Sequence, residues 1–150
     1  MSRPPSPWRE DVRPEWIDYN AHLSEPFYVL VLGHATDAVM ARIGMTPQHL
    51  TRTGTSLFTV EAHIRYLEQV EQGCTMEVSS SIIGAGPSSL WIWHEMWVDG
   101  SLRATEEVLA LHVSTVPAVR TTPFPDDIAT CIAGLCVDPP AQSGRRIVVR

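Results

Sequence analysis

A long apolar segment followed only by strand-like patterns restricts the fold more than any other feature of this sequence. Ser24 is a suitable helix N-cap, Pro26 occupies an early helical position, and Gly44 is a suitable stop. Apolar side chains recur at helical spacing on one face and also occupy the other faces. They are Tyr28, Leu32, Ala35, Val39 and Ile43 on the first face, and Phe27, Leu30, Val31, Ala38 and Met40 elsewhere. A helix that is apolar nearly all round is predicted to be wrapped by other structure.

The residues after this helix predict a run of strands. Apolar and polar residues alternate over 56–70, which is typical of a strand with one buried face. Further strands are predicted over 74–83, 89–98 and 102–113, and Asp99-Gly100 is a hairpin signal between the last two. We also expect a short extended segment over 8–16, a loop over 45–55 and a short helix over 126–135.

Because strands and helices do not alternate along the chain, a doubly wound sheet is excluded. The order favours an α+β fold in which a curved antiparallel sheet of about five strands wraps around one long central helix. We expect a single domain over 1–150, with a core at about 8–116 and a C-terminal extension over 117–150.

Composition limits the possible partners. The formal net charge of −6 argues against non-specific binding of nucleic acid. No apolar run approaches the roughly 18 to 20 residues of a membrane span. The cysteines, Cys74, Cys131 and Cys136, have no metal-ligand spacing, and Met1 to Glu10 lack the apolar region of a secretion signal. We therefore expect a cytoplasmic protein without a metal site.

Asp18 is the leading catalytic candidate, because it lies in the loop just before the long helix. Unpaired N–H groups and a partial positive charge are available at such a helix end. Hydrolysis of an activated acyl group needs a base or nucleophile and donors for the developing oxyanion. Asp18 is suited to the first role, and backbone N–H groups around Glu25 and Phe27 to the second. Alternatively, Asp18 only organises a turn.

Other polar and aromatic residues carry weaker signals. Asn20 and His22 either belong to the site or shape its loop. His63 shares a strand face with Glu61, which is typical of a site, a subunit contact or a solvated surface. Trp93 alternates with two further tryptophans and Glu95 on one strand, which indicates either an oligomer interface or an aromatic cage for a quaternary ammonium group. The two further tryptophans are Trp91 and Trp97.

From about Asp11 to Val116 the chain resembles the hotdog-fold thioesterases of the 4-hydroxybenzoyl-CoA thioesterase type. The resemblance rests on Asp18 before the helix, on Pro26 and Tyr28 at its start, and on two strand motifs. These motifs are His63 to Leu67 (HIRYL) and Ala104-Thr105 with Glu107.

The resemblance implies a hotdog fold in which the aspartate at the position of Asp18 is the catalytic carboxylate, acting as nucleophile or as base on water. N–H groups at the start of the central helix would polarise the thioester carbonyl. It also implies a homodimer or homotetramer, and coenzyme A as part of the substrate rather than as a cofactor.

Three stretches, WIDYNAH, FTVEAHIRYL and RATEEVLALHV, are similar to the betainyl-CoA thioesterases of carnitine degradation. The trimethylammonium group of that substrate would give the tryptophans and acidic residues a purpose. We therefore expect an acyl-CoA thioesterase for betainyl-CoA. The alternatives are a thioesterase for aromatic or short-chain acyl-CoA and a non-catalytic acyl-CoA binding module. The expected substrate-binding residues are Asn20, His22, Glu25, Phe27, Tyr28, His63 and Trp93.

Two positions depart from the family pattern. Many relatives carry a histidine seven residues after the catalytic aspartate, where this chain has Glu25. Some carry a tyrosine four residues before it, where this chain has Pro14. The resemblance therefore implies catalysis through Asp18 without identifying a second acid or base.

Overall fold

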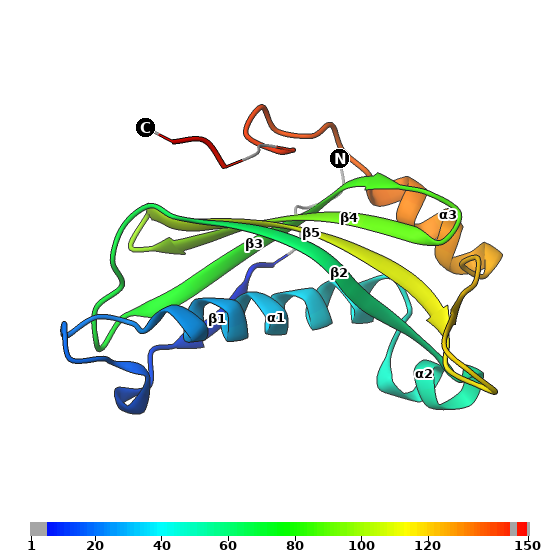
Figure 1. Ribbon diagram of the computed structural model, residues 1–150, viewed down its shortest axis with the longest axis horizontal. Helices are drawn as coiled ribbons and strands as arrows, with labels where there is room; N and C mark the ends of the chain where they lie inside the picture. Colours follow the sequence, from blue (N-terminus) through cyan, green and yellow to red (C-terminus); the bar gives the residue numbers. More distant parts are fainter. Residues whose placement is uncertain (1–5, 145–146, 150) are drawn as a thin grey trace.

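A computed structural model describes residues 6–144 and 147–149 of the chain. One antiparallel sheet curls over one long helix, α1 (Glu25–Arg42), as Figure 1 shows. The sheet has the order β1-β3-β4-β5-β2, and the short β6 pairs with β5. The strands are β1 (Trp8–Asp11), β2 (Thr55–Tyr66), β3 (Thr75–Ala85), β4 (Ser89–Val98), β5 (Ser101–Ser114) and β6 (Arg120–Thr121). The predicted α+β architecture is confirmed.

Three short helices complete the described part of the chain: η1 (Pro14–Trp16), α2 (Pro47–Thr53) and α3 (Asp126–Leu135). None of the helices in residues 6–144 and 147–149 is long and apolar enough to cross a membrane. The parts of the predicted lead-in and C-terminal extension at 1–5, 145–146 and 150 lie outside the described residues.

Helix α1 packs on the concave face of the sheet. The predicted apolar face is confirmed, because all five of its members are buried: Tyr28, Leu32, Ala35, Val39 and Ile43. The first half of the helix packs against Met76 and Met96, and the second half against Ile92. Val29 and Leu30, however, are 46% and 41% exposed. The sheet therefore wraps around the helix as predicted, but in a single chain it leaves these two side chains on the far side of the helix exposed.

Strand β2 is an edge strand of this sheet, and its predicted alternation breaks halfway along. A bulge at Val60 shifts the register against β5 between Thr59 and Glu61. Beyond the bulge the phase of the side chains changes, so that Thr59 and Ala62 both face α1. Phe58 and Val60 are 42% and 54% exposed. The prediction of one buried face along 56–70 is therefore wrong, because among the described residues β2 pairs with β5 alone.

The remaining predictions differ mostly at short elements. The predicted helix over 126–135 and the strand over 89–98 are confirmed. The hairpin signal is confirmed too, since Asp99 and Gly100 have φ of 49° and 76°. The predicted loop over 45–55 is wrong because it contains α2. The Thr46 hydroxyl caps this helix through the His49 amide, and Gly54 ends it with φ of 63°.

Candidate active site

Asp18 lies in a closed turn between Ile17 and Leu23, which form an isolated antiparallel bridge. The Asp18 amide donates to the His22 carbonyl at 3.0 Å, and the Asn20 amide donates to Asp18 Oδ1 at 2.8 Å. Ala21 has φ of 64°, which costs energy for a residue with a Cβ. One carboxylate oxygen thus organises the turn, as the simpler alternative required, and the turn in return fixes the position of the carboxylate.

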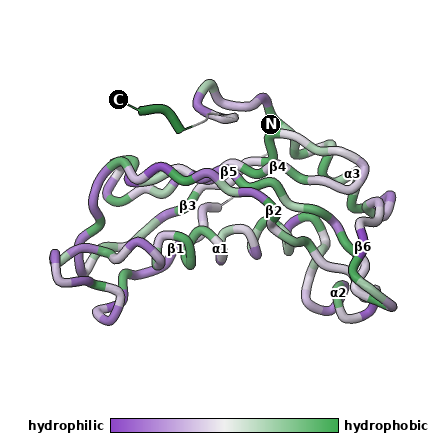
Figure 2. The backbone as a smooth tube through the Cα atoms, viewed as in Figure 1, coloured by the Kyte–Doolittle hydropathy of each residue, from purple (hydrophilic) through white to green (hydrophobic). Residues whose placement is uncertain are grey.

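Two backbone hydrogen bonds join this turn to the rest of the fold. The Leu23 amide donates to the Val70 carbonyl at 2.7 Å, and the Ser24 amide donates to the Trp16 carbonyl at 2.9 Å. The Trp16 and Phe27 rings stack at 5.3 Å between centroids. The Asp18 turn is therefore held against both the start of α1 and the connection between β2 and β3. In Figure 2 the connections at this end of the sheet are among the most hydrophilic parts of the chain.

A cavity of about 350 Å³ opens beside the turn. The structure brings together five of the eight predicted site residues in its lining: Asp18, Asn20, His22, Glu25 and Tyr28. The other wall is the end of β2 and the residues after it, which sequence reasoning missed: Tyr66, Leu67, Glu68 and Gln69. Two of these belong to the HIRYL motif, but nothing in the sequence indicated that β2 ends opposite Asp18.

The start of α1 supplies fewer amide donors than we predicted. The Ser24 side chain makes no capping bond, and Pro26 has no N–H. The Phe27 amide donates to the Ser24 carbonyl at 3.0 Å, in the tight i to i+3 geometry, so this predicted donor is already engaged. The Phe27 side chain packs on Trp16 instead of lining the cavity. The amides of Glu25 and Tyr28 remain as candidate donors at this helix end.

Two side chains in the cavity have unusual surroundings. Tyr28 is 5% exposed, and burial raises the pKa of its hydroxyl more than the Val70 backbone and Arg103 lower it. The neutral hydroxyl contacts the Glu68 carbonyl at 3.5 Å. His22 Nδ1 is buried and has no hydrogen-bond partner among the described residues. A buried nitrogen without a partner is costly, which makes His22 a candidate for contact with substrate or with a water molecule.

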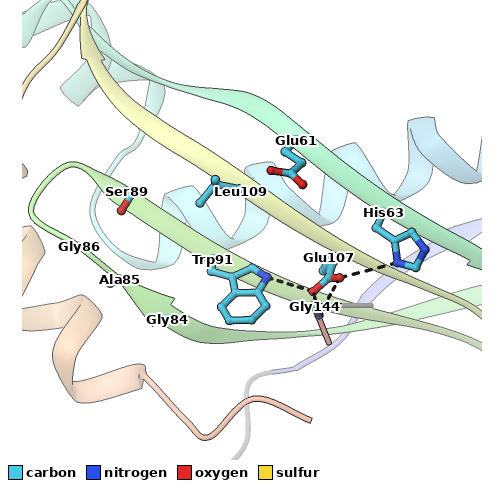
Figure 3. A pocket seen from close by; sticks show the side chains of 10 residues that line it. All are labelled: Glu61, His63, Gly84, Ala85, Gly86, Ser89, Trp91, Glu107, Leu109 and Gly144. Atoms are coloured by element: carbon cyan, nitrogen blue, oxygen red, sulfur yellow. Dashed lines mark hydrogen bonds and ion pairs between the residues drawn. The ribbon is translucent and has the colours of Figure 1, made fainter. Parts of the chain in front are cut away.

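His63 and Trp93 lie elsewhere, on the outer face of the sheet. Trp93 alternates along β4 with Ile92 and Met96, which pack against α1, so its side chain faces away from the helix. His63 is on β2 and lines an outer cavity together with Glu107. The Trp93 indole donates to Glu95 at 3.0 Å, and His63 Nδ1 lies 3.7 Å from the Glu107 carboxylate. Figure 3 shows His63 and Glu107 in a second cavity of about 560 Å³. Within one chain, the structure therefore does not bring these two residues to Asp18.

Glu107 is the centre of that outer cavity. Its carboxylate accepts from the Trp91 indole at 3.2 Å and from the Gly144 amide at 2.8 Å. The C-terminal segment, which carries Gly144, runs over the side of the sheet opposite α1 (Figure 1). The described residues hold no group of three or more metal-ligating side chains, here or elsewhere.

Comparisons with known proteins agree with this arrangement. The model of the Thioesterase-like superfamily matches residues 12–132. The chain belongs to this superfamily. It is an acyl-CoA thioesterase, a hydrolase acting on thioester bonds, and the expected hotdog fold is confirmed.

Individual relatives sharpen the family assignment. The betainyl-CoA thioesterase of Pseudomonas aeruginosa is 38% identical over 137 residues, which are 90% of this chain and 86% of that protein. An L-carnitine dehydrogenase/betainyl-CoA thioesterase of Agrobacterium fabrum is 40% identical over 111 residues, 73% of this chain but 22% of that protein.

Solved structures have the same fold. A protein from Pseudomonas putida, provisionally assigned as a thioesterase, has a TM-score of 0.84 at 30% identity and covers 100% of this chain and 99% of its own. A Staphylococcus aureus protein solved in complex with CoA has a TM-score of 0.88 at 23% identity, covering 96% and 94% of the two chains.

Proposed function

We propose that this thioesterase hydrolyses betainyl-CoA to glycine betaine and free CoA. The observation that carries the proposal is the 38% identity to the Pseudomonas aeruginosa betainyl-CoA thioesterase across nine-tenths of this chain. The similarity extends through the Asp18 turn, α1 and all the long strands. For the competing proposal, hydrolysis of aromatic or short-chain acyl-CoA, a solved gentisyl-coenzyme A thioesterase shares the fold at only 16% identity.

Asp18 is the proposed catalytic carboxylate. As a base it takes a proton from water while the water oxygen bonds to the thioester carbonyl carbon. The resulting oxyanion is stabilised by amides at the start of α1, those of Glu25 and Tyr28. Collapse of this intermediate breaks the C–S bond, and the CoA thiolate takes up a proton. As a nucleophile, Asp18 would instead bond to that carbon and expel the thiolate first, and water would hydrolyse the resulting anhydride.

Asn20, His22, Glu25 and Tyr28 are the proposed substrate-binding residues of this cavity. They are supported by its lining. Roles for Phe27, His63 and Trp93 in the site stay predictions from the sequence. We propose no resident cofactor, because the amides and Asp18 supply the groups that thioester hydrolysis requires.

A panel of acyl-CoA esters in a thiol-release assay tests the proposal. We expect betainyl-CoA to be hydrolysed with the highest kcat/KM, ahead of benzoyl-CoA and straight-chain acyl-CoAs. A preference for neutral aromatic or fatty acyl groups would reject the betainyl assignment while leaving the thioesterase activity intact. Label recovered in Asp18 after a single turnover in ¹⁸O-labelled water would identify the nucleophilic role, because only water attack on an anhydride at its aspartyl carbon leaves the label in the protein.

We also propose that the protein is a homodimer or homotetramer in the cytoplasm. The exposed apolar residues of the β2 edge and of α1 support assembly, since an uncovered edge strand invites pairing with another copy. Free cysteines at 74, 131 and 136 support a reducing compartment. Light scattering during gel filtration tests the assembly. A monomer at micromolar concentration would contradict it.

A further inference from the structure

The cavity beside Asp18 is acidic and aromatic. Its carboxylates belong to Asp18, Glu25 and Glu68, and its two rings to Tyr28 and Tyr66. Arg103 lies 3.0 Å from Glu68 and pairs with it. Among residues 6–144 and 147–149 no ion pair is found to the other two carboxylates, those of Asp18 and Glu25. An anionic acyl group would be repelled from such a lining, and a cationic one would be attracted.

Tyr66 is the ring that is open to a ligand. Its side chain is 44% exposed, whereas the Tyr28 ring is buried and packs against it edge-on, 5.1 Å away at 84°. Burial is the largest cause that raises the pKa of Tyr66, and the charges of Glu25 and Glu106 raise it further. Both carboxylates are near this ring, since Glu25 lines the same cavity and Glu106 is on the paired strand β5.

The burial of Glu106 is the second observation that supports binding of a cation, because this carboxylate has no partner among the described residues. It lies on the concave face of β5 opposite Ile64, one diagonal step from Tyr66 on β2. Its side chain is 5% exposed and lines the groove between α1 and β2. No hydrogen bond or ion pair to it is found among residues 6–144 and 147–149, and burial raises its pKa to about 7. A charge buried in this way is destabilising unless a counter-ion meets it.

We propose that the Tyr66 ring and the Glu25 carboxylate receive the quaternary ammonium group of the substrate's acyl portion, and that Glu106 attracts it electrostatically from the adjoining groove. A quaternary ammonium has no N–H to donate, so that an aromatic face and nearby negative charge are the groups that recognise it. In a betainyl thioester one methylene separates the nitrogen from the carbonyl carbon. The ammonium must therefore lie in the same cavity as Asp18, where Tyr66 is. This inference rests on the proposed function and names the residues behind its substrate preference.

The test uses a pair of substrates that differ only in charge. In 3,3-dimethylbutanoyl-CoA a carbon atom replaces the nitrogen of betainyl-CoA, so that size and shape are kept. We expect Glu106→Gln to lower kcat/KM for betainyl-CoA about tenfold and to leave the neutral isostere unchanged or improved. Tyr66→Leu is expected to lower the betainyl value about 5- to 30-fold, and Tyr66→Phe, which keeps the ring, only slightly. Equal loss for both substrates in Glu106→Gln and in Tyr66→Leu would overturn the proposal.

Controls separate this inference from the proposed function. Glu61→Gln removes an acidic side chain from the outer face and is expected to change neither substrate. If the wild type hydrolyses benzoyl-CoA but not betainyl-CoA, the proposed substrate is wrong. Inhibition of benzoyl-CoA hydrolysis by tetramethylammonium chloride then still tests whether the cavity beside Tyr66 binds a quaternary ammonium group. Inhibition beyond that of sodium chloride, and its loss in Glu106→Gln, would support the proposal. The absence of any specific inhibition would overturn it.

Discussion

Two neighbouring residues of β5, Glu106 and Glu107, are both buried, but on opposite faces of the sheet and in opposite circumstances. On the outer face, Glu107 accepts from the Trp91 indole and the Gly144 amide and lies beside His63. On the concave face, Glu106 has no partner among the described residues. A carboxylate whose lone pairs are filled by the protein stabilises the fold, whereas one without a partner is available to a ligand. This difference favours a structural role for Glu107 on the outer face and supports the proposal that a ligand binds near Glu106 on the concave face.

The largest expected effect is on catalysis from the concave face. Asp18→Asn is expected to lower kcat at least about a hundredfold, because loss of a general base typically costs this much or more. The matched control on the outer face is Glu107→Gln, which is expected to leave kcat unchanged in folded protein. Thiol release from betainyl-CoA measures both. Full activity in Asp18→Asn would contradict the proposal that thioester hydrolysis takes place in the cavity beside Asp18.

For the free energy of unfolding, we expect the outer-face variant Glu107→Gln to have a larger effect than the concave-face variant Glu106→Gln. Glu107→Gln removes a buried side-chain acceptor of the Trp91 indole and the Gly144 amide, so the free energy of unfolding should fall by about 1–3 kcal/mol. Glu106→Gln removes a buried carboxylate without a partner and should leave stability unchanged or higher at pH 8. Urea unfolding of both variants measures the difference. A larger loss in Glu106→Gln than in Glu107→Gln would mean that Glu106 has a structural partner.

The concave face should also give two opposed pH dependences. Burial raises the pKa of Glu106 to about 7, so its stabilising contribution is complete below pH 4.5 and is lost as pH rises toward 7. Burial lowers the pKa of His94, its cross-strand neighbour, to about 4, so its contribution is complete above pH 6.5 and is lost as pH falls toward 4.

Single variants separate the two slopes. In Glu106→Gln the free energy of unfolding should rise more steeply with pH between 4.5 and 7, and in His94→Gln less steeply. Each change is at most about 1.4 kcal/mol per pH unit. Urea unfolding across this range measures the slopes. Parallel profiles for wild type and both variants would contradict the assigned burial.

The smallest effect is expected from an exposed pair on the outer side of the sheet. Arg9 and Glu77 lie 3.1 Å apart, but their side chains are 64% and 41% exposed. Glu77→Gln should therefore change the free energy of unfolding by less than about 1 kcal/mol. A larger loss of unfolding free energy in Glu77→Gln, measured by thermal or urea unfolding, would contradict the prediction. It would mean that burial does not explain why Glu107 stabilises the fold more than the exposed acidic residues of this face.

Sequence patterns predicted the parts of this fold that depend on local periodicity. The buried face of α1 and the Asp18 turn before it could be predicted because helical spacing and turn residues act over a few positions. The lining of the site by Tyr66 and Glu68 could not, since it depends on β2 pairing with a strand about forty residues later. The same limit explains why His63 and Trp93 were grouped with Asp18. Strand alternation shows that residues share a face, but not whether that face is the one that covers the helix.

The position of β2 at the edge of the sheet has a consequence for the order of folding. Its partner β5 ends at Ser114, so the wall of the site that carries Tyr66 cannot be fixed until most of the chain is present. The hairpins joining β3, β4 and β5 close over short loops, whereas β2 must close a long one, which is slower. During synthesis and refolding, the Asp18 turn and α1 can therefore form before the cavity they serve. Thioesterase activity should return only with the last folding step, after most of the helical signal has recovered.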